Sequence, residues 1–171
     1  MESKLERNFW QFWLSGLLIL AAMIAMNPWF VTDLSPWGIR DHQSAGTAAR
    51  VDAIQMAWQA AGVLGPARLG IAIDLVYIAV YSFGAYYGGR LFAQSTKPTL
   101  RRLGWIIVAA AMIVGVADYA ETICQFIQIM QFKGSDVLAG IAATAQPIKT
   151  TAFLTSFFGL LTALFIRRMT R

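Results

Sequence analysis

Four ionisable side chains lie within stretches of the chain that are otherwise apolar. Asp74 interrupts one such stretch, Asp118 and Glu121 interrupt a second, and Lys149 lies at the start of a third. A charged group in apolar surroundings is costly, and it marks a functional site by default. A carboxyl group that holds a proton beside a lysine suits proton-coupled binding or acid/base chemistry.

The four charges are predicted to lie at nearly one depth. An α-helix rises about 1.5 Å per residue, so each depth follows from the distance in sequence to the basic residue that ends the stretch. Asp74 and Asp118 both lie about 24 Å from that end, Lys149 about 27 Å and Glu121 about 28 Å. The charges therefore form one layer in the outer part of a membrane.

Small and polar residues recur with helical spacing around these charges. The three stripes are Gly70, Asp74, Tyr77, Tyr81 and Gly84; Asp118, Glu121, Thr122, Gln125 and Gln128; and Gln146, Lys149, Phe153 and Ser156. An unpaired charge that faces lipid costs at least about 2.5 to 3.5 kcal/mol. The stripes are therefore expected to turn inward and form a polar pocket that opens toward the outer side.

The charge count within this layer indicates a ligand or a proton. Three acids and one lysine leave two surplus negative charges, so we expect at least one protonated carboxyl group or a bound cation. The predicted ligand- or proton-binding residues are Asp74, Tyr77, Tyr81, Asp118, Glu121 and Lys149. The acids would bind the ligand or the proton, with Lys149 as counter-ion and Tyr77 and Tyr81 as orienting hydroxyls. The alternative is that these groups only hold helices together through hydrogen bonds.

Composition identifies the class of protein to which these residues belong. Of 171 residues, 57% are hydrophobic and 13% are charged, whereas soluble domains carry about 25% charged residues. The mean hydropathy is +0.55. These values exclude a disordered chain, a nucleic-acid-binding domain and most soluble enzymes of this size. They indicate that the partner of the chain is the lipid bilayer itself.

Four apolar stretches are long enough to cross a membrane, at about 9–31, 69–89, 103–130 and 148–166. A span needs about 20 residues, and an isolated strand would leave its backbone groups unsatisfied in lipid. The predicted fold is all-α, a polytopic membrane four-helix bundle in a single integral domain over 1–171. The first stretch could instead be a signal peptide, but it is long and aromatic and lacks a good cleavage site, so a retained span is favoured.

The long first loop is predicted to contain an amphipathic helix over about 45–62. Val51, Ile54 and Trp58 recur at helical spacing, whereas Asp52 and Gln55 fall on another face. This helix would lie along the outer membrane interface or cap the bundle, and a cap is favoured over a lid that recruits substrate.

The distribution of basic residues predicts the orientation. Nine of the fourteen Lys and Arg residues lie at the two termini or in the loop between the second and third spans. By the positive-inside rule, both termini are cytoplasmic, in a bacterial inner membrane.

The only histidine and the only cysteine offer little chemistry. His42 is expected to be a surface residue of the outer loop rather than a metal ligand, and Cys124 a small core residue. No metal and no cofactor is expected. A single cysteine also excludes the disulfide-forming four-span proteins and relatives of vitamin K epoxide reductase.

The pattern resembles an uncharacterised family of bacterial four-span integral membrane proteins. The matching positions are Ala49, Arg50, Asp52, Ile54 and Trp58; Asp74 with Tyr81; Asp118 and Glu121; and Lys149. Thr122 stands where that family has Asn. The resemblance covers most of the chain from Thr47 onward and implies no activity.

The chain is also similar in size and topology to signal peptidase II, an aspartic protease of four spans. Residues 115–118 (Gly-Val-Ala-Asp) loosely match the second aspartate motif of that enzyme, but its first motif is absent around Asp74.

Three functions follow from the sequence. The leading hypothesis is a small lipophilic or cationic ligand bound in the polar pocket, with proton coupling. The alternatives are a membrane-embedded enzyme that acts on a lipid through paired carboxylates, and a non-catalytic accessory subunit of a membrane complex. Four short spans enclose little interior, so a homodimer or a partner protein also fits.

Overall fold

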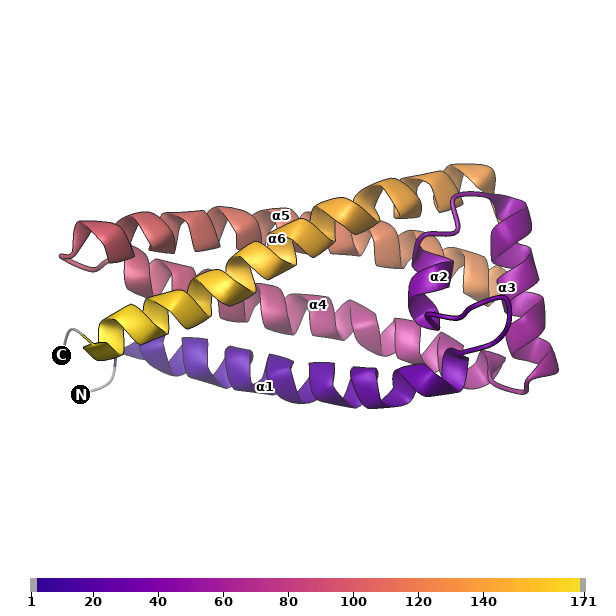
Figure 1. Cartoon of the computed structure of the whole chain (residues 1–171), viewed down its shortest axis with the longest axis horizontal. Coiled ribbons are helices and arrows are strands. Elements are labelled where there is room, and N and C mark those ends of the chain that lie inside the picture. The colour runs from indigo at the N-terminus through magenta and orange to yellow at the C-terminus, as the bar shows by residue number, and fades with distance from the viewer. Residues whose placement is uncertain (1–2, 170–171) are drawn as a thin grey trace. The chain divides into compact units, whose positions relative to one another are not determined.

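The computed structural model of the chain describes residues 3–169. Its elements are α1 (Lys4–Met26), η1 (Asn27–Phe30), α2 (Ile39–Gln43), α3 (Ala48–Ala60), α4 (Leu64–Ala93), α5 (Pro98–Gln131) and α6 (Asp136–Met169) (Figure 1). Within this range, the only extended pairing is an isolated bridge between Thr32 and Ser35. The predicted all-α fold is confirmed.

Four helices are long and apolar enough to cross a membrane, namely Lys4–Phe30, Leu64–Ala93, Pro98–Gln131 and Asp136–Met169. The chain is therefore a membrane protein with four candidate transmembrane helices, as its composition predicts. The last helix begins well before the apolar stretch that starts at 148, because the segment ahead of it is rich in alanine, the best helix former. Pro147 lies inside this helix. At 34 residues, α5 is about 51 Å long and exceeds the hydrocarbon thickness.

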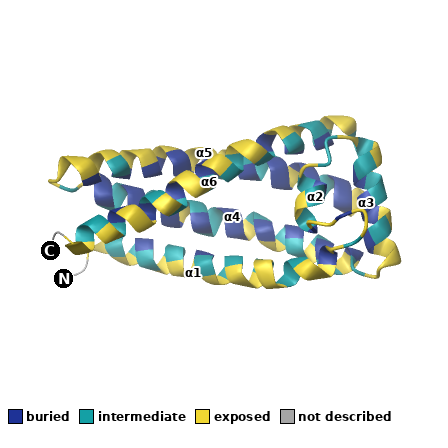
Figure 2. Cartoon of the chain, viewed as in Figure 1, coloured by how far each residue is buried: buried dark blue, intermediate teal, exposed yellow. Residues whose placement is uncertain are grey.

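The long helices pass through two compact units. Unit 1 consists of Met1–Leu18, Ile78–Val116 and Ile148–Arg171, and unit 2 consists of Ile19–Tyr77 and Ala117–Pro147. Each long helix carries buried residues on one side and exposed residues on the other, and α1 is the least buried of the four (Figure 2). The units differ in what they bury.

Unit 1 has an apolar interior to which α1, α4, α5 and α6 all contribute, so these segments form a four-helix bundle. Its core residues are Phe9, Ala85, Phe92, Leu100, Ile107, Ala111, Leu160 and Ala163. Among the described residues, the buried polar groups of unit 1 include the hydroxyls of Ser82 and Ser156, and Tyr81 is also buried. At one edge of the unit, the Arg167 guanidinium lies 2.7 Å from the Glu6 carboxylate.

Glycines bring two helices of unit 1 into backbone contact. A Cβ at Gly104 of α5 would lie 2.7 Å from the carbonyl oxygen of Gly89 on α4, and it would also collide with the amide nitrogen of Ala93. Backbone atoms cannot rotate away as a side chain does. Helices in lipid associate through close packing of this kind, because the hydrophobic effect does not drive them together.

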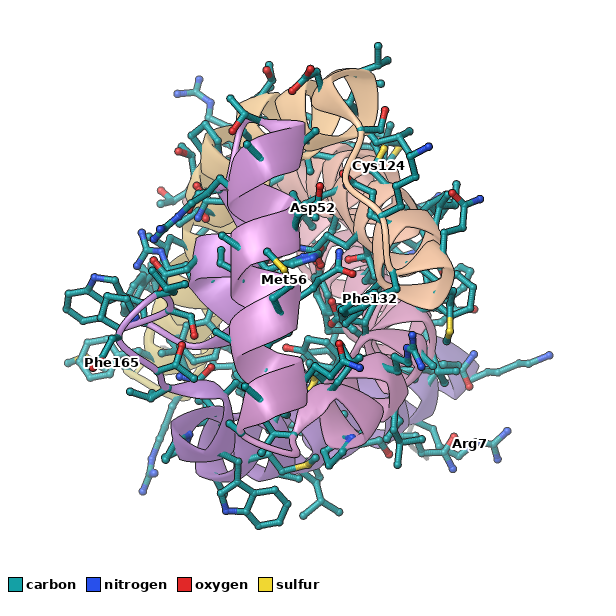
Figure 3. All side chains as sticks on the ribbon, turned by 90° about the vertical axis from the view of Figure 1, so that its right-hand side faces the viewer. Arg7, Asp52, Met56, Cys124, Phe132 and Phe165 are labelled. Carbon is teal, nitrogen blue, oxygen red and sulfur yellow. The ribbon has the colours of Figure 1, made fainter. Side chains whose placement is uncertain are left out.

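Unit 2 contains the predicted loop helix, α3, which runs crosswise over the ends of α4 and α5 (Figures 1 and 3). Its Trp58 is fully buried, and the indole Nε1 donates to the Phe30 carbonyl at 2.9 Å. The core around it consists of Phe30, Ile54, Trp58, Leu64, Ala67, Ile71 and Ile129. Met56 lies on the outer face of α3 and is 56% exposed (Figure 3). The helix is therefore a cap on unit 2.

Hydrogen bonds fix the start of this cap to the turn between α5 and α6. The Thr47 hydroxyl caps the helix by accepting from the Arg50 amide at 3.3 Å. The Ala48 amide donates to the Asp136 carboxylate at 2.7 Å, and the Gly134 amide donates to the Asp52 carboxylate. Segments far apart in the sequence thereby satisfy each other's unpaired backbone donors.

His42 and Gln55 are buried beneath the cap, at 2% and 1% exposure. The predicted surface position of His42 and the predicted polar face at Gln55 are therefore wrong. The imidazole stacks on Trp58 at 5.3 Å, and Gln55 Nε2 donates to His42 Nε2 at 3.3 Å, which places the imidazole proton on Nδ1. Burial lowers the pKa of His42 to about 4.

Replacing Gly104 by alanine should destabilise the protein, because the new methyl group forces the two backbones apart. The expected loss in the free energy of unfolding is about 1–3 kcal/mol, measured by thermal or denaturant unfolding in mild detergent. Gly140→Ala is the matched control, since a Cβ at this helical glycine meets no atom within 4 Å. The control should be neutral or more stable. Equal stability of Gly104→Ala and wild type would disprove the close contact.

The stability of the cap should fall as the pH falls from 6.5 toward 4. The unfolded chain binds a proton on His42 below about pH 6.5, whereas the folded protein resists it down to about pH 4. Stability should therefore decrease by up to roughly 1.4 kcal/mol per pH unit within this window. His42→Phe keeps an aromatic ring on Trp58 and should lose this part of the pH dependence. Parallel curves of melting temperature against pH for the two proteins would contradict the assignment.

Candidate functional site

Two aspartates from different helices approach each other inside unit 2. Asp74 lies on α4 and Asp118 on α5, and they are 7% and 5% exposed. Isolated carboxylates are rarely buried to this extent, because ionised groups lose most of their solvation energy in a low-dielectric interior. A local partner is therefore required.

The hydroxyl of Thr122 lies between the two carboxyl groups. Its Oγ1 is 3.1 Å from Asp74 Oδ2 and 3.4 Å from Asp118 Oδ1, and the threonine itself is fully buried. Thr122 lies one helical turn after Asp118 on α5, so both side chains face the same side. One side chain thus connects an acid of its own helix to an acid of the neighbouring helix.

The chemistry of this arrangement follows from the number of hydrogens on the threonine hydroxyl. A hydroxyl has one hydrogen to donate and two lone pairs that accept. Thr122 therefore donates to one carboxylate at a time. A contact with the second carboxyl is favourable when that carboxyl carries a proton and donates to Oγ1. The three groups together form a short chain along which one proton can be held.

The polar face of α5 continues on both sides of the threonine. The buried residues on this face, none more than 5% exposed, are Asp118, Glu121, Thr122, Gln125 and Gln128. Their spacing of three and four residues keeps them on one side of the helix. This burial agrees with the inward orientation predicted for the stripe.

Two hydrogen bonds hold α4 and α5 in register around the acids. The Tyr119 hydroxyl donates to the Leu75 carbonyl at 3.0 Å. Near the cap, Arg68 Nε donates to the Ile129 carbonyl, also at 3.0 Å. Because both bonds end on backbone oxygens, they fix the position of one helix along the other. The separation of Asp74 from Asp118 is thereby set by the scaffold.

The other predicted site residues divide between the units. Tyr77 is buried in unit 2 and interacts electrostatically with Asp74 and Asp118. Tyr81 and Lys149 belong to unit 1, where the Tyr81 ring packs edge-on against Phe153 at 5.5 Å. The roles of Tyr81 and Lys149 as orienting group and counter-ion stay predictions.

The residue that joins the acids was not among the predicted site residues. Thr122 was part of the polar stripe, and its position four residues after Asp118 was the available signal. Threonine is common in transmembrane helices, so the residue type alone does not identify Thr122 as part of a site. Among the described residues, no three His, Cys, Asp or Glu side chains are placed to hold a metal ion.

Removing the Thr122 hydroxyl should destabilise the protein. Thr122→Val keeps the shape but leaves the two buried carboxyl groups without this hydrogen bond, and we expect a loss of about 1–3 kcal/mol in the free energy of unfolding. Thr122→Ser should retain most of the stability. Thr155→Val on α6 is the matched control, because the Thr155 hydroxyl is exposed and bonds only to the Thr151 carbonyl of its own helix. A valine variant as stable as wild type would refute the bridging role.

Comparison of the chain with models of protein families, with curated proteins and with solved structures found no match.

Proposed function

We propose that this protein binds a small lipophilic or cationic ligand at Asp74, Asp118 and Glu121, and that the ligand exchanges with a proton held by the acids. The observation that carries the proposal is the single Thr122 hydroxyl between two buried carboxyl groups. In the proposal, Tyr77, which belongs to unit 2 as the acids do, orients the ligand.

Charge balance supports the exchange of a cation with a proton. Two carboxylates that are both ionised repel each other in a low-dielectric interior, and the unfavourable energy falls when one of them is neutralised. A proton does this in the absence of ligand, and a bound cation does it equally well. The proton and the cation therefore compete for the same carboxylate oxygens. An aliphatic ammonium group fits the site because it supplies several N–H donors to carboxylate oxygens.

The distribution of charge supports a bacterial inner membrane location with both termini in the cytoplasm. The segments of unit 1 contain ten Lys and Arg and two acidic residues, whereas those of unit 2 contain four basic and seven acidic residues. Both chain ends belong to unit 1. Under the positive-inside rule, this excess of basic residues supports a cytoplasmic position for both termini.

The test measures the binding of hexylammonium to the purified protein in mild detergent by calorimetry. Hexanol is the matched neutral probe, since it has the same chain and partitions into the detergent but carries no charge. We expect hexylammonium to bind saturably and hexanol not to bind. Because one proton leaves for each ammonium that binds, affinity should rise by about tenfold per pH unit wherever the acids hold their proton. Asp118→Asn should abolish binding.

Other outcomes identify the alternatives. If hexylammonium does not bind, the proposal fails. If in addition Asp118→Asn and Lys149→Met each destabilise the protein and the double variant restores it, these residues hold the helices together, as expected for an accessory subunit. Chemical change of a co-purified lipid that stops in Asp74→Asn would instead indicate the lipid-active enzyme.

A further inference from the structure

Gln125 is a fully buried amide on the polar face of α5. Its exposure is 0%, and neither Oε1 nor Nε2 has a hydrogen-bond partner within residues 3–169. Each buried polar atom left without a partner is destabilising, because its bond to water is lost and nothing replaces it. The stability of the fold therefore does not explain why a glutamine occupies this position.

Gln128, the next glutamine on the same face of α5, has a structural role. Gln128 donates from Nε2 to the Cys124 carbonyl at 3.1 Å, and its Oε1 accepts from the Ser135 amide at 3.0 Å. Both ends of this amide are used, and they tie the last turn of α5 to the segment that follows. Gln125 and Gln128 are equally buried, so burial alone does not explain why only one of them is satisfied.

Gln125 lies close to the acid pair. It follows Thr122 by three residues and Asp118 by seven, spacings that keep all three on one face of α5. Along the helix axis it is about 4.5 Å beyond Thr122 and about 10 Å beyond Asp118. A molecule bound at the acids and extending along this face would reach the unpartnered amide within the length of a short carbon chain.

The chemistry of the amide restricts the group that it would recognise. A carboxamide offers one acceptor and N–H donors side by side, so its complement is a neutral group that also presents a donor and an acceptor together. A carboxylate lacks the donor, and it would be repelled by Asp74 and Asp118. A second carboxamide satisfies both atoms.

We infer that Gln125 is a specificity-determining residue that binds the carboxamide of a ligand whose ammonium group lies at Asp74 and Asp118. The inference rests on the proposed function and deepens it, because it defines the ligand class as a short aliphatic ammonium compound with a carboxamide at its other end. Gln125 binds the neutral carboxamide end of the ligand, and the acids bind its ammonium group.

The experiment compares two probes that share the ammonium group and the chain. Pentylammonium ends in a methyl group, and 5-aminopentanamide ends in a carboxamide. Wild type in mild detergent should bind 5-aminopentanamide more tightly by about tenfold, the effect of two added hydrogen bonds. Gln125→Met has a side chain of similar length without amide atoms, so it should bind both probes equally while it retains the affinity for pentylammonium.

Controls separate recognition from folding. Gln128→Met removes an amide that is already satisfied, so it should lower the melting temperature and leave the preference for the carboxamide unchanged. Gln125→Met should melt no lower than wild type. A probe without amide N–H groups, 5-amino-N,N-dimethylpentanamide, should bind wild type no more tightly than pentylammonium, and this measurement needs no variant.

Two results would overturn the inference. Equal affinity of wild type for pentylammonium and 5-aminopentanamide would remove the role of Gln125 and leave the proposed function intact. Failure of both probes, together with failure of hexylammonium, would overturn the proposed function itself. A preference for 5-aminopentanamide that persists in Gln125→Met would assign the recognition of the carboxamide to another residue.

Discussion

One threonine hydrogen between two buried carboxyl groups is the constraint that orders unit 2. The hydroxyl reaches Asp74 and Asp118 only if α4 and α5 keep a fixed register, and backbone-directed bonds from Tyr119 and Arg68 maintain that register on either side. Because the loss of a hydrogen bond to a buried acid costs about 1–3 kcal/mol, sliding one helix along the other is opposed. The acids are thus held by a scaffold that does not depend on their charge state.

The two units obtain their stability from different interactions. Unit 1 buries apolar side chains and brings backbones together at glycines, the usual means of helix association in lipid. Unit 2 buries nearly all of the polar interior described here and is closed by α3, whose Trp58 bonds to the Phe30 carbonyl.

The sequence predicts the helices and the polar face of α5, because apolar runs and helical periodicity are local properties. It does not predict that His42 and Gln55 are buried, since His42 lies on α2, its partners Trp58 and Gln55 lie on α3, and only the folded cap brings them together. It also gives no distinction between Gln125 and Gln128. Both are glutamines on the same face of α5. They differ in hydrogen bonding because the turn after α5 places Ser135 beside Gln128.

The residue at position 122 determines how strongly the acids need a proton or a cation. An asparagine at this position would have two N–H donors, enough for one hydrogen bond to each carboxylate. Threonine has one donor, so one of the two carboxyl groups in this chain must take its hydrogen from elsewhere. An amide lies one turn away at Gln125, and its polar atoms have no hydrogen-bond partner within residues 3–169. A neutral amide cannot balance the charge of the acids, but its donor and acceptor can bind a neutral group of the cation that does.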